Sequence, residues 1–477
     1  MRSPEILSRQ WPVDELKDSQ DALGRMDTVC KDCGAKKWSR ETSSVCCLGG
    51  KVWLEPLKPP PKEIKNLLFG DGVESRLGRE HIRSLNNALA MSSVRVKERK
   101  VGNFTPTVIF QGKVTEFIGS VRSETGESAR FSQLYTLDSA LEETYRVANM
   151  SLPTSVTPNQ QRVLVGLLKK LQEELKTVNP FVKDFKLICE IPEAELTDGK
   201  VVLSARARPQ GEHERRWNLQ VCKTEVSIIH DSGPHDLVLR VRGGGVQTIS
   251  DLNPSAMPLH FVLLFPHGTF GWKPELKHSD GVKRVSPREW MAYRLNVRQD
   301  DDYLFSAGRL FQEFICFGYV VMENQRLSYH QHNQKALRAD TFKNVREALN
   351  ERLAERVPLE DRMGGDTRET IGRKVILASS FTKGKRWYNS KFQDGMAICR
   401  KFRQPDLFLT FTCNPHWEEI RRELQPGQEA KDRPDLVSRV FKMKKDLFLE
   451  DLVKSGICGK TVAQIWVIEY QKVYNID

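Results

Sequence analysis

The segments PDLFLTFT (405–412), PDLVSRVFKMKKDLFLEDLVKSG (434–456) and QIWVIEYQ (464–471) decide the predicted fold. The first and third are rich in β-branched and aromatic residues, so each predicts a strand. The middle segment has apolar residues at helical spacing and predicts a helix with Gly456 as its C-terminal cap. A strand, a helix and a second strand in this order predict a sheet covered by helices.

One carboxylate interrupts the last of these predicted strands. Glu469 falls on the same face as Ile465 and Val467. Trp466 and Ile468 fall on the opposite face, because successive side chains of a strand alternate. The pattern predicts a buried strand, and a carboxylate in such a strand is a candidate for a functional group.

Outside this region the sequence alternates between helical and β-rich stretches. Ser286, Pro287 and Glu289 have the spacing of an N-cap, a first-turn proline and a capping box, which predicts a helix start. An extended linker is predicted over LEPLKPPPK (54–62). The other predicted helices lie at 139–149, 161–178 and within 302–338, and β-rich stretches at 106–122 and 196–260.

Length and charge restrict the class of protein. A chain of 477 residues is long enough for two or three domains. No apolar run reaches the length of a membrane span, and the polar N-terminus does not have the pattern of a signal peptide. Six of the ten cysteines are scattered, which indicates a reducing, intracellular compartment. The net charge of +12 favours a polyanionic partner, nucleic acid first.

Four cysteines near the N-terminus form the best metal candidate. Cys30 and Cys33 are spaced as a CxxC turn, and Cys46 and Cys47 follow twelve residues later. Four thiolates suit tetrahedral zinc, but the adjacent pair needs a tight turn, which Gly49 and Gly50 would permit. The alternative is four free thiols in a loop.

A basic and aromatic segment at 379–403 is the candidate surface for single-stranded DNA. Cations neutralise phosphates, while flat rings stack on unpaired bases. The alternative is a solvated basic loop over a hydrophobic floor. The candidate DNA-binding residues are Lys383, Lys385, Arg386, Trp387, Tyr388, Lys391, Arg400 and Lys401.

Three other signals are weak. SGICGKT (455–461) has Lys454 where a phosphate-binding loop needs glycine, so no ATP site is predicted in this chain. His330 and His332 fall in a predicted helix, where residues two apart diverge, so they are predicted to be polar helix-face residues. Tyr470 and Tyr474 are attributed to strand packing and to a chain end, not to nucleophiles.

The stretch FRQPDLFLTFTCNPHWEEI (402–420) resembles the replication-initiator part of Helitron transposon proteins, known as the Helitron helicase-like region. The resemblance extends over most of the chain. It includes CKDCGAKKW (30–38), FQGKVTEFIGSV (110–121), PLHFVLLFPHGTFGW (258–272), LSYHQHNQKALR (327–338) and SSFTKGKRWYNSKFQDGMAICRKF (379–402), in the family's order.

The resemblance implies a nuclear, rolling-circle HUH endonuclease, in which a divalent Mg or Mn ion polarises a phosphate that a tyrosine attacks. It aligns Glu469 with a possible third metal ligand. The family continues with RGLPH-x-H, whereas this chain has VYNID at 473–477. The chain is therefore expected to be a truncated initiator that binds DNA without cutting it. Alternatives are a non-catalytic or domesticated DNA-binding protein, and part of a helicase whose ATPase domain lies elsewhere.

The predicted fold class is α+β or mixed, with a cysteine zinc-type module, an α/β middle region and an incomplete HUH-type α/β nuclease domain. The predicted divisions are a polar arm (1–24), the cysteine module (25–58), a mixed α/β region (59–250) and the Helitron helicase-like domain (251–477).

Overall fold

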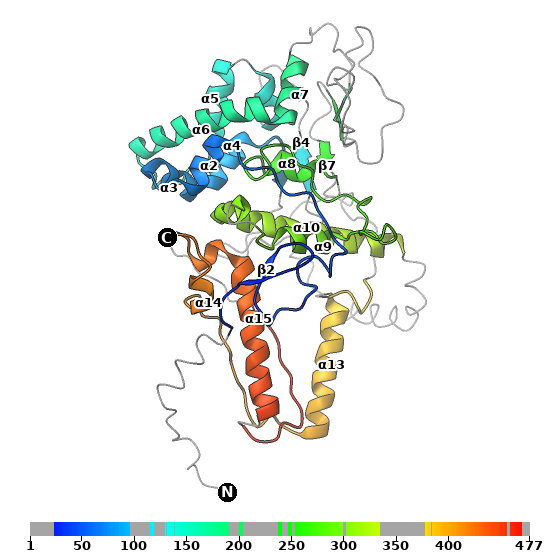
Figure 1. Cartoon of the computed structure of the whole chain (residues 1–477). Coiled ribbons are helices and arrows are strands. Elements are labelled where there is room, and N and C mark those ends of the chain that lie inside the picture. Colours follow the sequence, from blue (N-terminus) through cyan, green and yellow to red (C-terminus); the bar gives the residue numbers. More distant parts are fainter. Residues whose placement is uncertain are drawn as a thin grey trace, which may run out of the picture. The chain divides into compact units, whose positions relative to one another are not determined.

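The computed structural model describes residues 23–95, 115–118, 129, 131–137, 139–189, 200–203, 237–240, 247–249, 253–298, 302–333, 377–382, 384–455 and 458–469. The chain divides into two compact units, each made of two stretches of sequence (Figure 1). Unit 1 comprises Met1–Met322 and Cys413–Met443, and unit 2 comprises Glu323–Thr412 and Lys444–Asp477. The predicted four-part division remains a prediction.

Helices dominate unit 1. α10 and α15 begin in this unit and continue into unit 2. The helices are α2 (Lys62–Phe69), α3 (Val73–Glu80), α4 (Ile82–Leu89), α5 (Ser139–Asn149), α6 (Pro158–Val178), α7 (Pro180–Cys189), α8 (Ala256–His260), α9 (Pro287–Arg294), α10 (Gly308–His332), α14 (Glu418–Arg421) and α15 (Pro434–Glu450). Short 3₁₀ turns are η1 (Phe131–Thr136), η4 (Tyr303–Ser306) and η8 (Ala430–Asp432).

The described strands are short and pair in three small antiparallel sheets. β1 (Thr28–Val29) pairs with β2 (Lys36–Lys37), and β5 (Lys200–Leu203) with β6 (Leu237–Arg240). β4 (Thr115–Ile118) lies between β3 (Ser93–Arg95) and β7 (Gln247–Ile249). The fold is therefore mixed, as predicted, and β4 to β7 confirm β structure within 106–122 and 196–260.

Capping residues set the boundaries of α6 and α9, although α6 begins at Pro158, three residues before the predicted start at 161. The Thr157 hydroxyl accepts a hydrogen bond from the Gln160 amide at the start of α6, and α6 ends at the Asn179 cap. Ser286 and Glu289 form the predicted capping box of α9. The end of α6 and the start of α9 depend on neighbours in sequence, which is why these two boundaries could be predicted.

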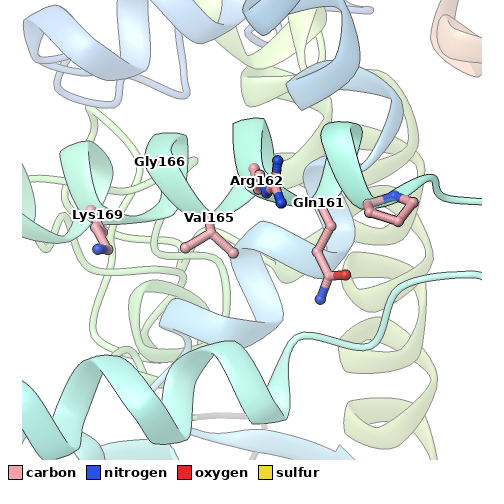
Figure 2. A pocket seen from close by; sticks show the side chains of 6 residues that line it. Gln161, Arg162, Val165, Gly166 and Lys169 are labelled. Carbon is pink, nitrogen blue, oxygen red and sulfur yellow. The ribbon is translucent and has the colours of Figure 1, made fainter.

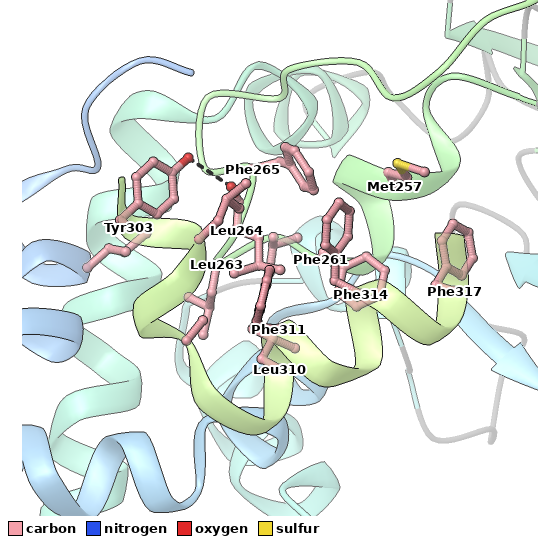
Figure 3. Close-up of a cluster of buried hydrophobic side chains, with 14 of the residues drawn as sticks. Met257, Phe261, Leu263, Leu264, Phe265, Tyr303, Leu310, Phe311, Phe314 and Phe317 are labelled. Carbon is pink, nitrogen blue, oxygen red and sulfur yellow. Dashed lines mark hydrogen bonds between the residues drawn. The ribbon is translucent and has the colours of Figure 1, made fainter. Parts of the chain in front are cut away.

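Aromatic side chains form the core where α8 and the segment after it meet α10 (Figure 3). Phe261 packs edge-on against Phe314 and Phe317, and Phe265 lies 5.6 Å from Phe314 between ring centroids. The Tyr303 hydroxyl donates a hydrogen bond of 2.8 Å to the Leu264 carbonyl. This packing confirms the predicted buried helix for the first turns of α10.

No described helix is long and apolar enough to cross a membrane.

Unit 2 contains α13 (Lys385–Phe402), the ends of α10 and α15, and a π-helical turn, η9 (Asp451–Ser455). Phe411 stacks on Phe448 of α15 at 5.0 Å, and the Lys445 ammonium lies 4.5 Å from the ring centroid of Trp466. Segments 405–412 and 461–469 thus lie beside the end of α15. Gly456, the predicted cap, falls outside the described residues.

The predicted buried strands at 405–412 and 464–471 are wrong for the residues that the structure describes. Neither segment is assigned as a strand or pairs with one within 405–412 and 464–469. Phe408 is 94% exposed and Val467 is 76% exposed. The sequences favour extended structure, but a strand also needs a neighbour to satisfy its backbone groups, and no described strand provides it. The predicted HUH-type sheet is not confirmed.

His330 also departs from the prediction of a polar helix face. Both His330 and His332 lie in α10, as predicted, but His330 is buried and packs edge-on against Phe381 at 5.2 Å. The Arg326 guanidinium lies over the same ring at 4.8 Å. Burial, followed by the charge of Arg326, lowers the pKa of His330, so this side chain serves packing.

A buried ion pair fixes α5 to its surroundings in unit 1. The Glu142 and Arg146 side chains are both fully buried and lie 2.8 Å apart. Arg146 also donates to the Ala88 carbonyl at 2.6 Å and lies 4.0 Å from the Tyr135 ring centroid. A buried charge is tolerated when its partner and its hydrogen bonds are all present.

Replacing Arg146 with Met is expected to destabilise the protein by about 3 kcal/mol, because the Glu142 carboxylate would lose its main partner. Urea unfolding followed by circular dichroism measures this change. The double variant Glu142→Gln with Arg146→Met is the control and is expected to recover part of the loss. An Arg146→Met protein that unfolds at the wild-type urea concentration would contradict this account.

Candidate metal centre and nucleic-acid surface

The four cysteines predicted as zinc ligands come together in unit 1. The sulfur atoms of Cys30, Cys33, Cys46 and Cys47 all lie within 4.8 Å of one another. Sγ of Cys47 is 3.8 Å from Sγ of Cys30 and 3.8 Å from Sγ of Cys46. Cys30, Cys46 and Cys47 are buried, and Cys33 is half-buried. Among the described residues, this is the one group of three or more such side chains.

Two tight turns bring the sulfurs together. In the first, between β1 and β2, the Gly34 amide donates to the Cys30 carbonyl at 2.8 Å, and Gly34 has a φ of 72°. In the second, Gly49 and Gly50 have φ values of 66° and 79°, a region that glycine adopts without strain. The Gly50 amide donates to Sγ of Cys47 at 3.2 Å. The turn that an adjacent cysteine pair requires is therefore formed.

Burial and backbone hydrogen bonds act in opposite directions on these thiols. Burial by itself raises the pKa of Cys30, but hydrogen bonds from the Asp32 and Cys33 amides outweigh it, and the pKa falls to about 7. Burial raises the pKa of Cys47 to about 11 and also raises the pKa of Cys46. Four thiolates so close together therefore need a cation before all can ionise.

The spacing of the sulfurs fits zinc. A tetrahedron of sulfurs with Zn–S distances of about 2.3 Å has edges of about 3.8 Å. Two sulfur pairs here are 3.8 Å apart, and all four sulfurs lie within 4.8 Å of one another. Four sulfur ligands with no open position are typical of a structural site, so a metal here would stabilise the fold and would not bind substrate.

Distant parts of unit 1 hold the cysteine loop in place. Arg439 of α15 forms two hydrogen bonds with the Glu41 carboxylate, at 2.7 and 2.6 Å, and its guanidinium lies 4.9 Å from the Trp38 ring centroid. The Lys36 amide donates to the Val297 carbonyl at 2.8 Å, just after α9. The loop that carries the four-cysteine cluster is thus packed against other parts of unit 1.

The predicted DNA-binding residues lie on one helix of unit 2, with one exception. Lys383 falls outside the described residues, and the other seven lie in α13. No residue of this 18-residue helix is buried. Tyr388 is 56% exposed and Phe392 is 64% exposed. The cations of the described part are therefore carried by a solvated helix and not by a loop, and their role in DNA binding stays a prediction.

Several polar and aromatic groups of α13 have contacts within unit 2, and Arg386 donates to the Leu377 carbonyl at 3.5 Å. Lys391 pairs with Asp394 at 3.3 Å, and both side chains are mostly exposed. The Lys401 ammonium lies 5.2 Å from the Phe402 ring centroid. Trp387 packs edge-on against Tyr388 at 5.1 Å. Cations and aromatic rings are therefore presented together on a solvent-exposed helix.

Glu469 does not join a metal site within the described residues. Its side chain is exposed, and it belongs to no cluster of three or more metal-binding groups there. Tyr470 and Tyr474 fall outside the described residues. Within SGICGKT, the described residues Cys458 and Gly459 lie in a turn, and Gly459 has a φ of 89°.

A shallow hollow on α6 provides little chemistry. Figure 2 shows Gln161, Arg162, Val165, Gly166 and Lys169 along the surface of this helix. Only one helix lines the hollow, and the site lacks the convergent polar groups that orient a ligand. The surface is therefore useful mainly as a source of control variants.

Replacing Cys46 with Ser is expected to abolish zinc binding, whereas the wild-type chain should retain about one zinc ion through gel filtration. Cys46 is buried among the other sulfurs, and a hydroxyl is a poor substitute for a thiolate. Elemental analysis measures the metal content. Cys458→Ser is the matched control, since Cys458 is exposed and outside the cluster. Equal zinc in Cys46→Ser and wild type would rule out this ligand set.

Comparison with known proteins identifies part of the chain. Residues 290–473, less than half of the sequence, match the family described as the Helitron helicase-like domain at the N-terminus. No curated protein matches the chain. The match includes the end of α9, α10, α13 and α15, and it leaves the cysteine loop outside. Residues 290–473 therefore resemble the Helitron helicase-like N-terminal domain.

Proposed function

We propose that this chain is the DNA-binding part of a Helitron rolling-circle replication initiator. It engages single-stranded DNA through α13, and its cysteine loop holds one structural zinc ion. The family match supports the context, and the exposed surface of α13 is the observation that carries the proposal. A location in the nucleus follows from a substrate in chromosomal DNA.

The composition of α13 suits a single strand better than a duplex. Tyr388 and Phe392 are four residues apart, so their rings lie on one side of the helix. Exposed rings of this kind can stack on unpaired bases, which a duplex does not offer. Lys391, Arg400 and Lys401 on the same helix can neutralise backbone phosphates.

The described residues support binding more directly than cutting. Their one metal cluster has the closed ligand set of a structural site, and the exposed Glu469 is not one of its members. Incubating a labelled oligonucleotide with the chain and Mg²⁺ or Mn²⁺ separates the two activities. Binding without cleavage supports a DNA-binding protein, and a covalent DNA–protein product supports initiator chemistry as well.

Replacing Arg400 and Lys401 with Gln is expected to weaken single-stranded DNA binding and its salt dependence together. Loss of two phosphate contacts should reduce the slope of log K against log salt by about 1.4. Fluorescence anisotropy over a salt series measures both quantities. The control Arg162→Gln with Lys169→Gln removes the same charge from α6. An equal effect of the two double variants would show that only net charge matters.

Replacing Tyr388 and Phe392 with Ala is expected to weaken binding by about 1–3 kcal/mol for each base that a ring stacks on, with the salt slope unchanged. A lower affinity with an unchanged salt slope would distinguish a loss of base stacking from a loss of phosphate contacts. Because neither ring is buried, helical content should remain at the wild-type level. Wild-type affinity in this variant would leave α13 without a role in base stacking.

A further inference from the structure

An arginine from the Helitron-like region reaches the cysteine cluster. Nη2 of Arg298 lies 3.6 Å from Sγ of Cys33, although the two residues are 265 positions apart. Arg298 follows α9 within the matched residues 290–473. The contact therefore joins the metal candidate to a part of the chain that the sequence treats as separate.

The guanidinium of Arg298 is fixed in position by its own segment. Nη1 donates to the carbonyls of Tyr293 and Asn296, the second at 2.9 Å. The guanidinium carbon lies 3.5 Å from the centroid of the Tyr293 ring. Among the described side chains, Arg298 forms no ion pair with a carboxylate. Its positive charge therefore acts on the sulfur of Cys33 and also on the Asp302 carboxylate, where it opposes the rise in pKa that burial causes.

The net charge of a bound zinc centre explains why a positively charged side chain is favourable next to Cys33. Zinc with four thiolates has a net charge of about −2, and this charge is half enclosed by protein. A hydrogen bond from a charged donor to one thiolate lowers the free energy of the complex, as outer-shell partners of metal ligands do. Arg298 can donate to the Cys33 thiolate from Nη2 while Nη1 donates to two carbonyls, because the donors of a guanidinium form a planar fork.

A second contact, a hydrogen bond between backbone groups, joins the same two segments. The Lys36 amide, three residues after Cys33, donates to the Val297 carbonyl immediately before Arg298. The turn that carries Cys33 and the end of α9 are therefore joined at two adjacent points. A change at the metal would be transmitted to α9 through both of them.

We infer that Arg298 is the outer-shell partner of the cysteine metal centre and couples metal occupancy to the end of α9. The inference rests on the proposed zinc site and adds a positioning residue to it. In the bound state Arg298 would stabilise the Cys33 thiolate, and the zinc ion would in turn hold Arg298 and the end of α9 in place.

The test compares zinc affinities of the full-length chain and three variants by competition with a chromophoric chelator. Arg298→Gln is expected to bind zinc about 10-fold more weakly or worse, and Arg298→Lys to fall between it and wild type. Arg288→Gln is the matched control, since it removes the same charge from an exposed position on α9. Hydrogen exchange over residues 287–298, with and without zinc, measures the coupling.

The outcomes distinguish the inference from the zinc site itself. Cobalt substitution should give the absorption of a tetrahedral four-thiolate site in wild type and in Arg298→Gln, which shows that the variant is folded and keeps its ligands. Equal affinities for Arg298→Gln and Arg288→Gln would overturn the inference and leave the zinc site standing. A wild-type chain that binds no zinc would overturn both.

Discussion

The ion pair between Arg439 and Glu41 joins two parts of unit 1 that lie far apart in sequence. Its two residues are separated by 398 positions, and both side chains are largely buried. Burying two charges costs free energy unless geometry and hydrogen bonding are good. Here the contact is bidentate, and Arg439 also donates to the Lys36 carbonyl and lies over Trp38. The cysteine loop thus has one preferred position against α15.

Two arginines therefore support the cysteine loop from different helices. Arg439 reaches it from α15, and Arg298 from the end of α9. A loop with two short strands has little core of its own, and metal ligation is the usual remedy for so small a structure. In this protein the cysteine loop is not a separate module, because the Lys36 amide, three residues after Cys33, donates a hydrogen bond to the Val297 carbonyl.

Local signals predicted much of this structure, and contacts between distant residues could not be predicted. The capping box of α9 and the two cysteine pairs follow from residues that are close in sequence, so their sequences were sufficient. Arg298 and Arg439 carried no such signal, since an arginine is ordinary on a protein surface. The segments at 405–412 and 464–471 failed for a related reason: β-forming residues need a partner strand before a ladder exists.

The exposure of α13 is hard to explain by folding alone. The helix contains the rings of Tyr388 and Phe392 on one side, and in a self-sufficient fold such a side would be covered. Ile465 reaches the helix near Gly395, where an added Cβ would lie 3.7 Å from its Cδ1, yet α13 still buries no residue. A purely apolar partner would not neutralise the cations of α13, of which Lys391 pairs with a carboxylate of the same helix, whereas the proposed single DNA strand could contact rings and cations together. The composition of this one helix therefore favours nucleic acid over a protein partner.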